Sequence, residues 1–533
     1  MSEPDDASPD AVHPPRADLA ALNEQRALAL DVSRVDAVEK RHRLGKRTAR
    51  ENVADLCDAD SFLEFGALVL AAQRSRRSIE ELQRETAADG LVSGIGQING
   101  AVFGPDRARC VVMSYDYSVL AGTQGFQNHR KTDRMIEVAA AQSLPVVFFV
   151  EGGGGRPGDV DVNAVMASWL EVETFQAFAH LSGKVPLIGI TAGRCFAGNA
   201  AFLGCCDVTI ATRDANIGMG GPAMIEGGGL GQFTPDEVGP ISVQSANGVV
   251  DIVVDDEAQA VRVAKQYLSY FQGATEPGEA PDPQRLRNAI PENRRFAYDV
   301  RKVIEALADV GSVLELRRGF ASNLVTALIR VEGRPLGVLA NNPAQLAGAI
   351  DSVAADKAAR FMQLCDAHRL PMLSLCDTPG IMVGPNAEKT GTVRHAARMF
   401  VVGASVTVPW FAIVLRKGYG LGAQAMLGGH LKRTLFTVAW PTGEFGPMGL
   451  EGAVKLGFRR ELDAITDPAQ RDARFRELVA EMYEQGKAAN VATYFEIDDV
   501  IDPADSRRWI VDGLRMRREP APDPKHRRYI DPW

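Results

Sequence analysis

The apolar run Trp410–Leu415 leads directly into Arg416-Lys417-Gly418-Tyr419-Gly420-Leu421-Gly422-Ala423-Gln424-Ala425-Met426. Six apolar residues bounded by turn signals predict a buried strand. The glycines that follow permit a sharp turn and a close approach of the backbone to a ligand, because they lack a Cβ. A helix opening at Ala423 would present unpaired amides to that ligand. The pattern predicts an oxyanion-binding turn, and it also fits the weaker dinucleotide pattern Gly420-x-Gly422-x-x-Ala425.

Landmarks of this region occur twice, at a spacing of about 225 residues, which is typical of an internal repeat. The matched pairs are Leu144-Pro145 with Leu370-Pro371, Val185-Pro186 with Val408-Pro409, Gly198 with Gly422, and Gly221-Pro222-x-x-Ile225-Glu226-Gly227 with Gly446-Pro447-x-x-Leu450-Glu451-Gly452. Strand-like runs alternate with helical stretches, which indicates βαβ units and a helix-covered sheet. We therefore expect an α/β protein of two tandem domains related by duplication.

The predicted boundaries follow composition. Residues 1–17 have the composition of a disordered tail, and residues 273–291 are rich in proline, glycine and acidic side chains, which is typical of a linker with little to bury. The two domains are then residues 18–272 and 292–533. Within the first, residues 17–56 favour one or two exposed helices, and Leu91–Val112 favours a hairpin around Asn99-Gly100.

Composition narrows the classes of function. A net charge of −9 argues against nucleic-acid binding, and no uncharged run is long enough to span a membrane. The seven cysteines, an odd number without Cys-x-x-Cys spacing, favour reduced thiols in the cytoplasm. The eight histidines have no metal-ligand spacing, so we expect no metal site.

The chain resembles the carboxyltransferase (β) subunit of the biotin-dependent acyl-CoA carboxylases, of the propionyl-CoA and methylcrotonyl-CoA carboxylase type. The resemblance spans roughly residues 40–515 in a fixed order of motifs. They are Gly45–Glu51, Asp116–Val119, Gly193–Asp207, Tyr298–Arg301, Ala340–Pro343, Arg394-His395, Arg416–Met426, Ala439–Thr442, Gly449–Val454 and Ile497–Asp505.

This resemblance implies two crotonase-like domains, each a β-β-α superhelix. It implies that the first domain binds acyl-CoA, with the thioester oxygen held by the amides of Ala197 and Gly198. The second would accept carboxybiotin, with the ureido oxygen held by the amides of Leu421 and Gly422. Carboxybiotin would release CO2, biotin would take a proton from the α- or vinylogous carbon, and the thioester enolate would attack the CO2.

The resemblance also implies partners. The chain has no Ala-Met-Lys-Met biotinylation motif. Biotin is therefore expected on a biotin carboxylase/biotin carboxyl carrier subunit, and coenzyme A is expected as part of the substrate. The site would lie between two copies of the chain, in a hexameric β core.

The chain departs from the family pattern near both predicted sites. Where the family has Ser-Gly-Gly-Ala-Arg, this chain has Glu151-Gly152-Gly153-Gly154-Gly155-Arg156. We interpret Gly152 and Gly153 as the retained glycine pair, Arg156 as a contact for CoA phosphates, and Glu151 as a strand-end carboxylate bonded to nearby amides. Gln424 lies at the position of the acyl pocket, where the family often has aspartate or an aliphatic residue. The sequence therefore does not predict which acyl chain is bound.

Two alternatives remain. One is the carboxyltransferase of a sodium-pumping acyl-CoA decarboxylase, which a membrane partner would distinguish. The other is a non-catalytic crotonase-fold scaffold, against which the two intact glycine turns argue.

Overall fold

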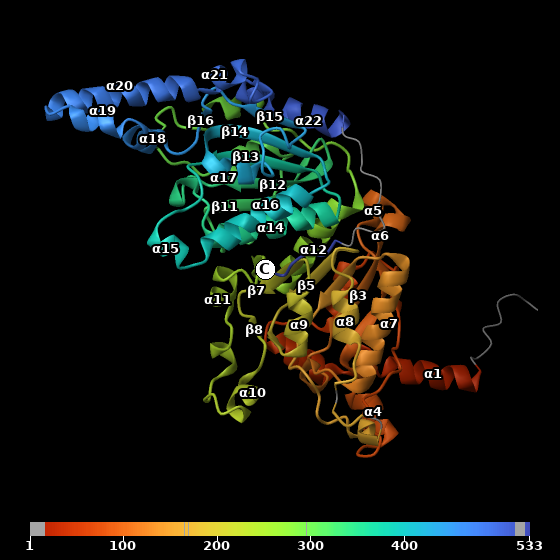
Figure 1. Ribbon diagram of the computed structural model, residues 1–533. Coiled ribbons are helices and arrows are strands. Elements are labelled where there is room, and N and C mark those ends of the chain that lie inside the picture. The colour runs from red at the N-terminus through yellow and green to blue at the C-terminus, as the bar shows by residue number, and fades with distance from the viewer. Residues whose placement is uncertain (1–15, 165, 169, 295, 517–527) are drawn as a thin grey trace, which may run out of the picture.

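The protein consists of two halves, each built on one sheet with helices on both faces (Figure 1). The computed structural model describes residues 16–164, 166–168, 170–294, 296–516 and 528–533. Residues 1–15 of the expected tail lie outside the described residues, and Ala17 already begins helix α1 (Ala17–Ala27). The two halves form the lower and upper parts of the molecule in the figure.

The first sheet has seven strands in the order β1-β2-β3-β4-β5-β7-β9. Their bounds are β1 (Leu63–Glu64), β2 (Leu91–Gln97), β3 (Arg109–Tyr115), β4 (Val146–Phe149), β5 (Leu187–Thr191), β7 (Val208–Thr212) and β9 (Ile252–Val254). Pairing is antiparallel from β1 to β3 and parallel from β3 onward. The small strands β6 (Arg194–Phe196) and β8 (Asn216–Gly218) pair separately.

The second sheet repeats this order as β10-β11-β12-β13-β14-β15-β17. The strands are β10 (Leu314–Leu316), β11 (Leu324–Val331), β12 (Arg334–Asn341), β13 (Met372–Thr378), β14 (Trp410–Tyr419), β15 (Phe436–Ala439) and β17 (Asp499–Val500), and β16 (Glu444–Gly446) pairs with the end of β14. The change from antiparallel to parallel falls at the same place, between β12 and β13. The predicted duplicated α/β fold is confirmed.

Only some of the helices correspond between the halves. The first half has α2 (Val35–Arg43), α3 (Ala49–Leu56), α4 (Ile79–Glu85), α5 (Gly100–Phe103), α6 (Pro105–Ala108), α7 (Phe126–Gln142), α8 (Thr174–Ala179), α9 (Gly198–Gly204), α10 (Pro222–Gly227), α11 (Ile241–Ala246) and α12 (Glu257–Gln272). The second has α13 (Arg301–Leu307), α14 (Ser352–Ala367), α15 (Pro385–Glu388), α16 (Thr392–Ser405), α17 (Gly420–Met426), α18 (Leu450–Gly457), α19 (Arg459–Ala464), α20 (Pro468–Gly486), α21 (Ala488–Thr493) and α22 (Ser506–Met516).

Fine details of the backbone are duplicated too. The turns Leu120–Gly122 and Leu346–Gly348 both place three consecutive residues at positive φ. The helices that follow them carry buried lysines, Lys131 and Lys357, at equivalent positions. Each ammonium group donates to backbone carbonyls of the loop that leads into the second strand, those of Ala88 and Leu324 among them. The repeat therefore extends to buried polar contacts.

The structure corrects the register of the repeat at the turns. Phe196 pairs with Gly218, and Tyr419 pairs with Gly446, at the ends of equivalent strands. Ala197 therefore corresponds to Gly420, and Gly198 to Leu421 rather than to Gly422. Gly446 also lies in strand β16, whereas Gly221 precedes helix α10, so the Gly-Pro pairs are not equivalent.

Two sequence expectations for the first half were inaccurate. Three helices, α1 to α3, occupy residues 17–56, and α3 buries Val53 and Leu56 behind a capping box formed by Thr48. Strands β2 and β3 are antiparallel as expected, but α5 and α6 connect them, so Asn99-Gly100 is not a tight hairpin turn.

The segment 273–291 packs against the second half. Leu286 and Ile290 are buried in the same apolar cluster as β11, β13 and β14, and the Thr275 N–H donates to the Gly333 carbonyl. Apolar burial of this kind is absent from a free linker.

Buried polar contacts join the halves. Arg317 Nε donates to Asp251 Oδ1 over 3.0 Å, and His368 Nε2 lies 2.8 Å from Asp207 Oδ2. The C-terminus lies between the halves in Figure 1, where the Ile530 N–H donates to Ser182 Oγ. Among the described residues, no helix has the length and apolar character needed to cross a membrane.

Candidate active site

The first glycine turn joins β6 to α9. Ala197 adopts φ 51° and ψ −120°, a conformation that strains a residue with a Cβ. Its N–H donates to the Gly218 carbonyl over 3.0 Å, and its carbonyl accepts the first helical hydrogen bond, from Ala201. The N–H of Gly198 has no hydrogen-bond acceptor in the described part of the chain. Ala197, predicted as an oxyanion donor, is thus already occupied, whereas Gly198 is free.

The second part of this site is the glycine loop 152–155, which follows β4. The N–H of Gly152 donates to the Arg194 carbonyl over 2.7 Å, and the N–H of Gly153 donates to the Ala121 carbonyl over 3.1 Å. The N–H of Gly154 donates to Asn199 Oδ1 over 2.9 Å. Gly155 N–H is left without an acceptor among the described residues.

The glycine loop and the turn are in direct contact. A Cβ built on Gly154 would lie 2.7 Å from the Cβ of Ala197, and one built on Gly152 would clash with the side chain of Asn199. The free amides of Gly155 and Gly198 therefore belong to two segments packed against each other. Paired free amides of this kind can stabilise an oxyanion.

The second half reproduces this arrangement at the end of β14. Gly420 adopts φ 54°, and α17 starts there. The loop after β13 reaches Ile381, whose bridge to Ile350 matches the bridge of Gly155 to Gln124. A Cβ on Gly422 would lie 2.6 Å from the backbone of Gly380, so loop and turn again touch.

The corresponding amides in the second half are those of Ile381 and Leu421. Neither has a hydrogen-bond acceptor in the described residues. The Leu421 side chain is 61% exposed beside them. Each half therefore carries one pair of free amides at equivalent places.

The predicted substrate contact Arg156 lies beneath the glycine loop. Its guanidinium is buried between Asp89 and Asp159, and Nη2 donates to the Thr123 carbonyl over 2.7 Å. Burial raises the pKa of Asp89 to about 6, although Arg156 opposes that shift. The structure therefore corrects the expectation of an arginine open to CoA phosphates, because its donors are directed to buried partners.

Gln424 lies on the exposed face of α17. It borders a cavity of about 410 Å³ that is also lined by Gly420, Phe445, Leu450 and Met482. Most of the named lining is apolar. A cavity of this size suits part of a ligand's apolar chain.

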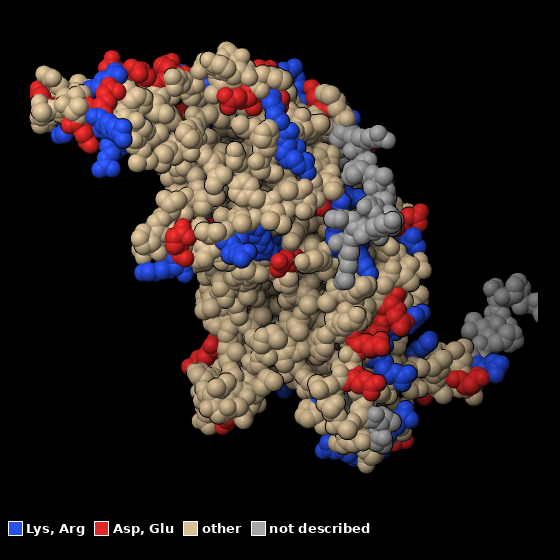
Figure 2. All heavy atoms as spheres, in the orientation of Figure 1, with Lys and Arg blue, Asp and Glu red and all other residues tan. Residues whose placement is uncertain are grey.

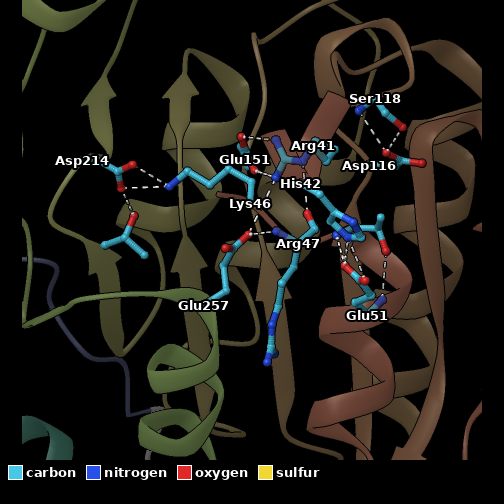
Figure 3. A network of polar contacts seen from close by, with 12 residues as sticks. Arg41, His42, Lys46, Arg47, Glu51, Asp116, Ser118, Glu151, Asp214 and Glu257 are labelled. Carbon is cyan, nitrogen blue, oxygen red and sulfur yellow. Dashed lines mark hydrogen bonds and ion pairs between the residues drawn. The ribbon is translucent and has the colours of Figure 1, made fainter. Parts of the chain in front are cut away.

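Glu151 precedes the glycine loop and has a structural partner (Figure 3). Its two carboxylate oxygens accept hydrogen bonds from Arg41 of α2 over 3.0 and 2.8 Å. The second half places Asp377 at the same position, where Arg416 Nε donates to it over 3.0 Å. The structural interpretation of Glu151 is thus supported, but its partner is a guanidinium and not the nearby amides.

Sequence reasoning missed Gln124, Asn199 and Ile381. Asn199 is fully buried, and its Nδ2 also donates to the Gly122 carbonyl over 3.4 Å. Gly155 belongs to a glycine run, and its free amide can be identified only once the acceptors of its neighbours are known. A one-residue shift of the repeat would have shown Ile381 opposite Gly155.

The histidine and cysteine side chains near the first turn are poorly suited to general-base catalysis at neutral pH. Burial lowers the pKa of His129 to about 4, and its Nδ1 lies 3.0 Å from Thr174 Oγ1. All seven cysteines are free thiols, and burial raises the pKa of Cys195 well above its ordinary value. The described residues contain no cluster of three or more His, Cys, Asp or Glu side chains that could hold a metal ion.

The chain is similar to known proteins over most of its length. The carboxyl transferase domain family matches residues 40–529. The chain is 35% identical over 519 residues to the methylmalonyl-CoA carboxyltransferase 12S subunit of Propionibacterium freudenreichii subsp. shermanii, covering 95% of each chain.

Two solved structures extend the comparison. A single-chain, multi-domain long-chain acyl-CoA carboxylase is 59% identical with a TM-score of 0.89, over 94% of this chain and 49% of that one. The present chain thus spans about half the length of that enzyme. The transcarboxylase 12S hexamer, solved with methylmalonyl-coenzyme A and methylmalonic acid bound, is 33% identical with a TM-score of 0.83, over 97% and 99% of the two chains.

The family match covers most of the chain, and the relatives are carboxyltransferases that share its two-domain fold. The chain therefore belongs to the carboxyl transferase family, the carboxyltransferases of biotin-dependent acyl-CoA carboxylases, and is an enzyme of that family.

Proposed function

We propose that the protein transfers a carboxyl group from carboxybiotin, carried by a partner, to an acyl-CoA. The observation that carries this proposal is the presence of two equivalent pairs of free amides, Gly155 with Gly198 and Ile381 with Leu421. Transfer between a biotin ureido group and a thioester requires two oxyanions to be stabilised. One pair of donors is available for each.

The first half binds the thioester. The N–H groups of Gly155 and Gly198 donate to its carbonyl oxygen and stabilise the enolate that forms when the α-carbon loses its proton. Ala197 and Gly154 hold these donors in place, since their own polar groups are bonded within the protein. One donor of this type typically contributes about 3 kcal/mol to lowering the barrier.

The second half binds the biotin ureido oxygen through the amides of Ile381 and Leu421. Carboxybiotin supplies CO2 and the base that removes the α-proton. No ionisable side chain of this chain is needed as the base, which agrees with the low pKa of His129. The chain's contribution is to orient both groups and to exclude water around them.

A long acyl chain is the substrate class that we favour. The relative with 59% identity carries out carboxylation of long-chain acyl-CoA, whereas the methylmalonyl-CoA enzyme is 35% identical. The cavity beside Gln424 and Gly420, with Phe445, Leu450 and Met482 in its walls, would accommodate apolar carbon atoms. Gln424 is the side chain from which we expect chain-length preference to be set.

We further propose that the protein works as a homo-oligomer with a biotin carboxylase/biotin carboxyl carrier partner in the cytoplasm. The face shown in Figure 2 has a broad uncharged area below a central cluster of Lys and Arg side chains. Exposed apolar side chains gather on the segments around α10 and α18, including Met224, Leu230 and Leu456. Such a surface suits packing against a second copy, as in the 12S hexamer.

The proposal is tested by purifying the chain from its native host and assaying the recovered complex. We expect a biotin-bearing carboxylase to co-purify, and we expect biotin- and ATP-dependent carboxylation of acyl-CoA that increases from acetyl-CoA to long-chain thioesters. Recovery of an integral membrane subunit with acyl-CoA decarboxylation would favour the sodium-pumping alternative. Recovery of neither activity, with no biotinylated partner, would favour a scaffold.

A further inference from the structure

Gln124 lies against the first glycine turn. Its backbone pairs with the glycine loop: its N–H donates to the Gly154 carbonyl over 2.7 Å, and its carbonyl accepts from the Arg156 N–H over 2.9 Å. Its side chain is directed at Gly198, where an added Cβ would clash with Gln124 Oε1. The residue is only 3% exposed.

A chain of buried hydrogen bonds fixes the orientation of this amide. Gln124 Nε2 donates to the Tyr115 hydroxyl over 3.2 Å, and that hydroxyl donates to Asn128 Oδ1 over 3.2 Å. Asn128 Nδ2 in turn donates to the Asp89 carbonyl over 3.1 Å. Since the Tyr115 hydroxyl has one hydrogen, it can give it to Asn128 only while it accepts from Gln124. Oε1 is therefore the amide atom that faces Gly198.

Burial shields this relay from solvent. It raises the pKa of Tyr115 far above its ordinary value, so the hydroxyl stays protonated. Tyr115 is 4% exposed, and Asn128 is completely buried. Solvent therefore has little access to the Tyr115 and Asn128 side chains of the relay.

Oε1 of Gln124 has no hydrogen-bond donor among the described residues. The Gln124 side chain is almost fully buried, so an N–H of a bound ligand would supply a donor that this oxygen lacks in the described part of the protein. The fold does not require a polar side chain at this position, because Ile350 occupies the equivalent bridge position in the second half. A polar side chain has thus been placed at the acyl-CoA half alone.

We propose that Gln124 Oε1 accepts a hydrogen bond from an N–H of the bound acyl-CoA, that of the amide closest to the thioester sulfur. This inference rests on the proposed function, which places the thioester oxygen at the amides of Gly155 and Gly198. A simple acyl chain carries no N–H, and this amide is the donor nearest to the thioester in the coenzyme A arm. Gln124 is therefore a substrate-binding residue shared by all acyl-CoA substrates.

The test compares two ligands on the assembled full-length protein. One is a non-reactive acyl-CoA analogue, and the other is the same analogue with that amide nitrogen replaced by a methylene group. We expect the wild-type protein to bind the first about 5- to 10-fold more tightly, as for one uncharged hydrogen bond. Gln124→Leu should weaken binding of the first by the same factor and leave binding of the second unchanged.

Tyr115→Phe provides a second variant. It removes the hydroxyl that orients Gln124 but leaves the acceptor in place, so we expect a smaller loss of preference, about 2- to 3-fold. Equal preference in the wild type, Gln124→Leu and Tyr115→Phe would overturn the inference. So would a defect confined to carboxybiotin, which would place Oε1 on the ureido side. A wild-type assembly that binds no acyl-CoA would overturn the proposed function itself.

Discussion

The two glycine turns begin at residues with similar positive φ angles, but different contacts hold them in place. In the first half, side chains connect the loop to the turn: Asn199 binds Gly154, and Gln124 reaches Gly198. In the second half the equivalent positions are Gly422 and Ile350, and the loop backbone packs directly against the turn. The difference teaches that the free backbone amides are the shared feature, whereas polar side chains at the turn distinguish the half that we propose binds acyl-CoA.

The carboxylates before the two loops differ in the same sense. Asp377 is neutralised by Arg416 from the neighbouring strand of its own sheet. Glu151 instead binds Arg41 from an N-terminal helix, and a Cβ on Gly193, which corresponds to Arg416, would clash with Glu151. The first half thus depends on residues distant in sequence for its loop. Variants at equivalent positions can test whether side chains hold the loop of the first half while backbone packing holds the loop of the second half.

The largest effect is expected for Gly422→Ala. Its Cβ would meet the Gly380 backbone at 2.6 Å, so the loop that carries Ile381 must move. Displacement of a catalytic group by about 1 Å can cost about 100-fold in rate, and we expect that loss in carboxybiotin decarboxylation. Gly198→Ala meets the Gln124 side chain instead, which must shift from its hydrogen bond with Tyr115, and we expect a loss of about 10-fold, confined to exchange of the acyl α-proton. Equal losses in both half-reactions for either variant would contradict the assignment of halves.

An intermediate effect is expected for Asn199→Ala. The variant leaves the buried Gly154 N–H without its acceptor, which should cost about 1–3 kcal/mol in the free energy of unfolding. Denaturant unfolding measures this loss, and acyl α-proton exchange should fall while carboxybiotin decarboxylation stays near normal. Asn288→Ala, at an exposed position, serves as the matched control. A stability change no larger than that of the control would show that Asn199 does not hold the loop.

A smaller effect is expected at the residue that begins each turn. Gly420→Ala forces a Cβ into φ 54° and to 2.7 Å from the Pro447 carbonyl oxygen, which should lower the free energy of unfolding by about 2 kcal/mol.

The smallest effect is expected for the reverse change, Ala197→Gly. Glycine removes the strain at φ 51°, so the free energy of unfolding should rise by about 1 kcal/mol or less. Thermal unfolding of the two purified variants measures both changes. A destabilising Ala197→Gly would mean that the turn is not strained and that the two turns are not equivalent.

Much of this fold could be predicted because local patterns report it. The run Trp410–Leu415 lies within β14, and the glycines after it form the predicted turn. The register of the repeat could not be read from glycine spacing, since Gly420 and Gly422 both fit the pattern. Only the pairing of Tyr419 with Gly446 identifies Leu421 as the counterpart of Gly198.

Other site features depend on contacts between distant residues. Arg156 could not be recognised as buried, because its partner Asp89 lies 67 residues away in the chain. The same holds for Glu151 and Arg41, which are 110 residues apart. An amide can be recognised as free only when all the other hydrogen bonds of the protein are known. The roles of Gly155 and Ile381 could therefore be identified only from the structure.

The central claim is that the amides of Gly155 and Gly198 hold the acyl-CoA thioester oxygen while those of Ile381 and Leu421 hold the biotin ureido oxygen. A structure of the assembled protein with a non-reactive acyl-CoA analogue tests it most directly. We predict that the thioester oxygen lies about 2.7–3.1 Å from the nitrogens of Gly155 and Gly198. A thioester oxygen bound at Ile381 and Leu421, or bound by the guanidinium of Arg156, would contradict the account.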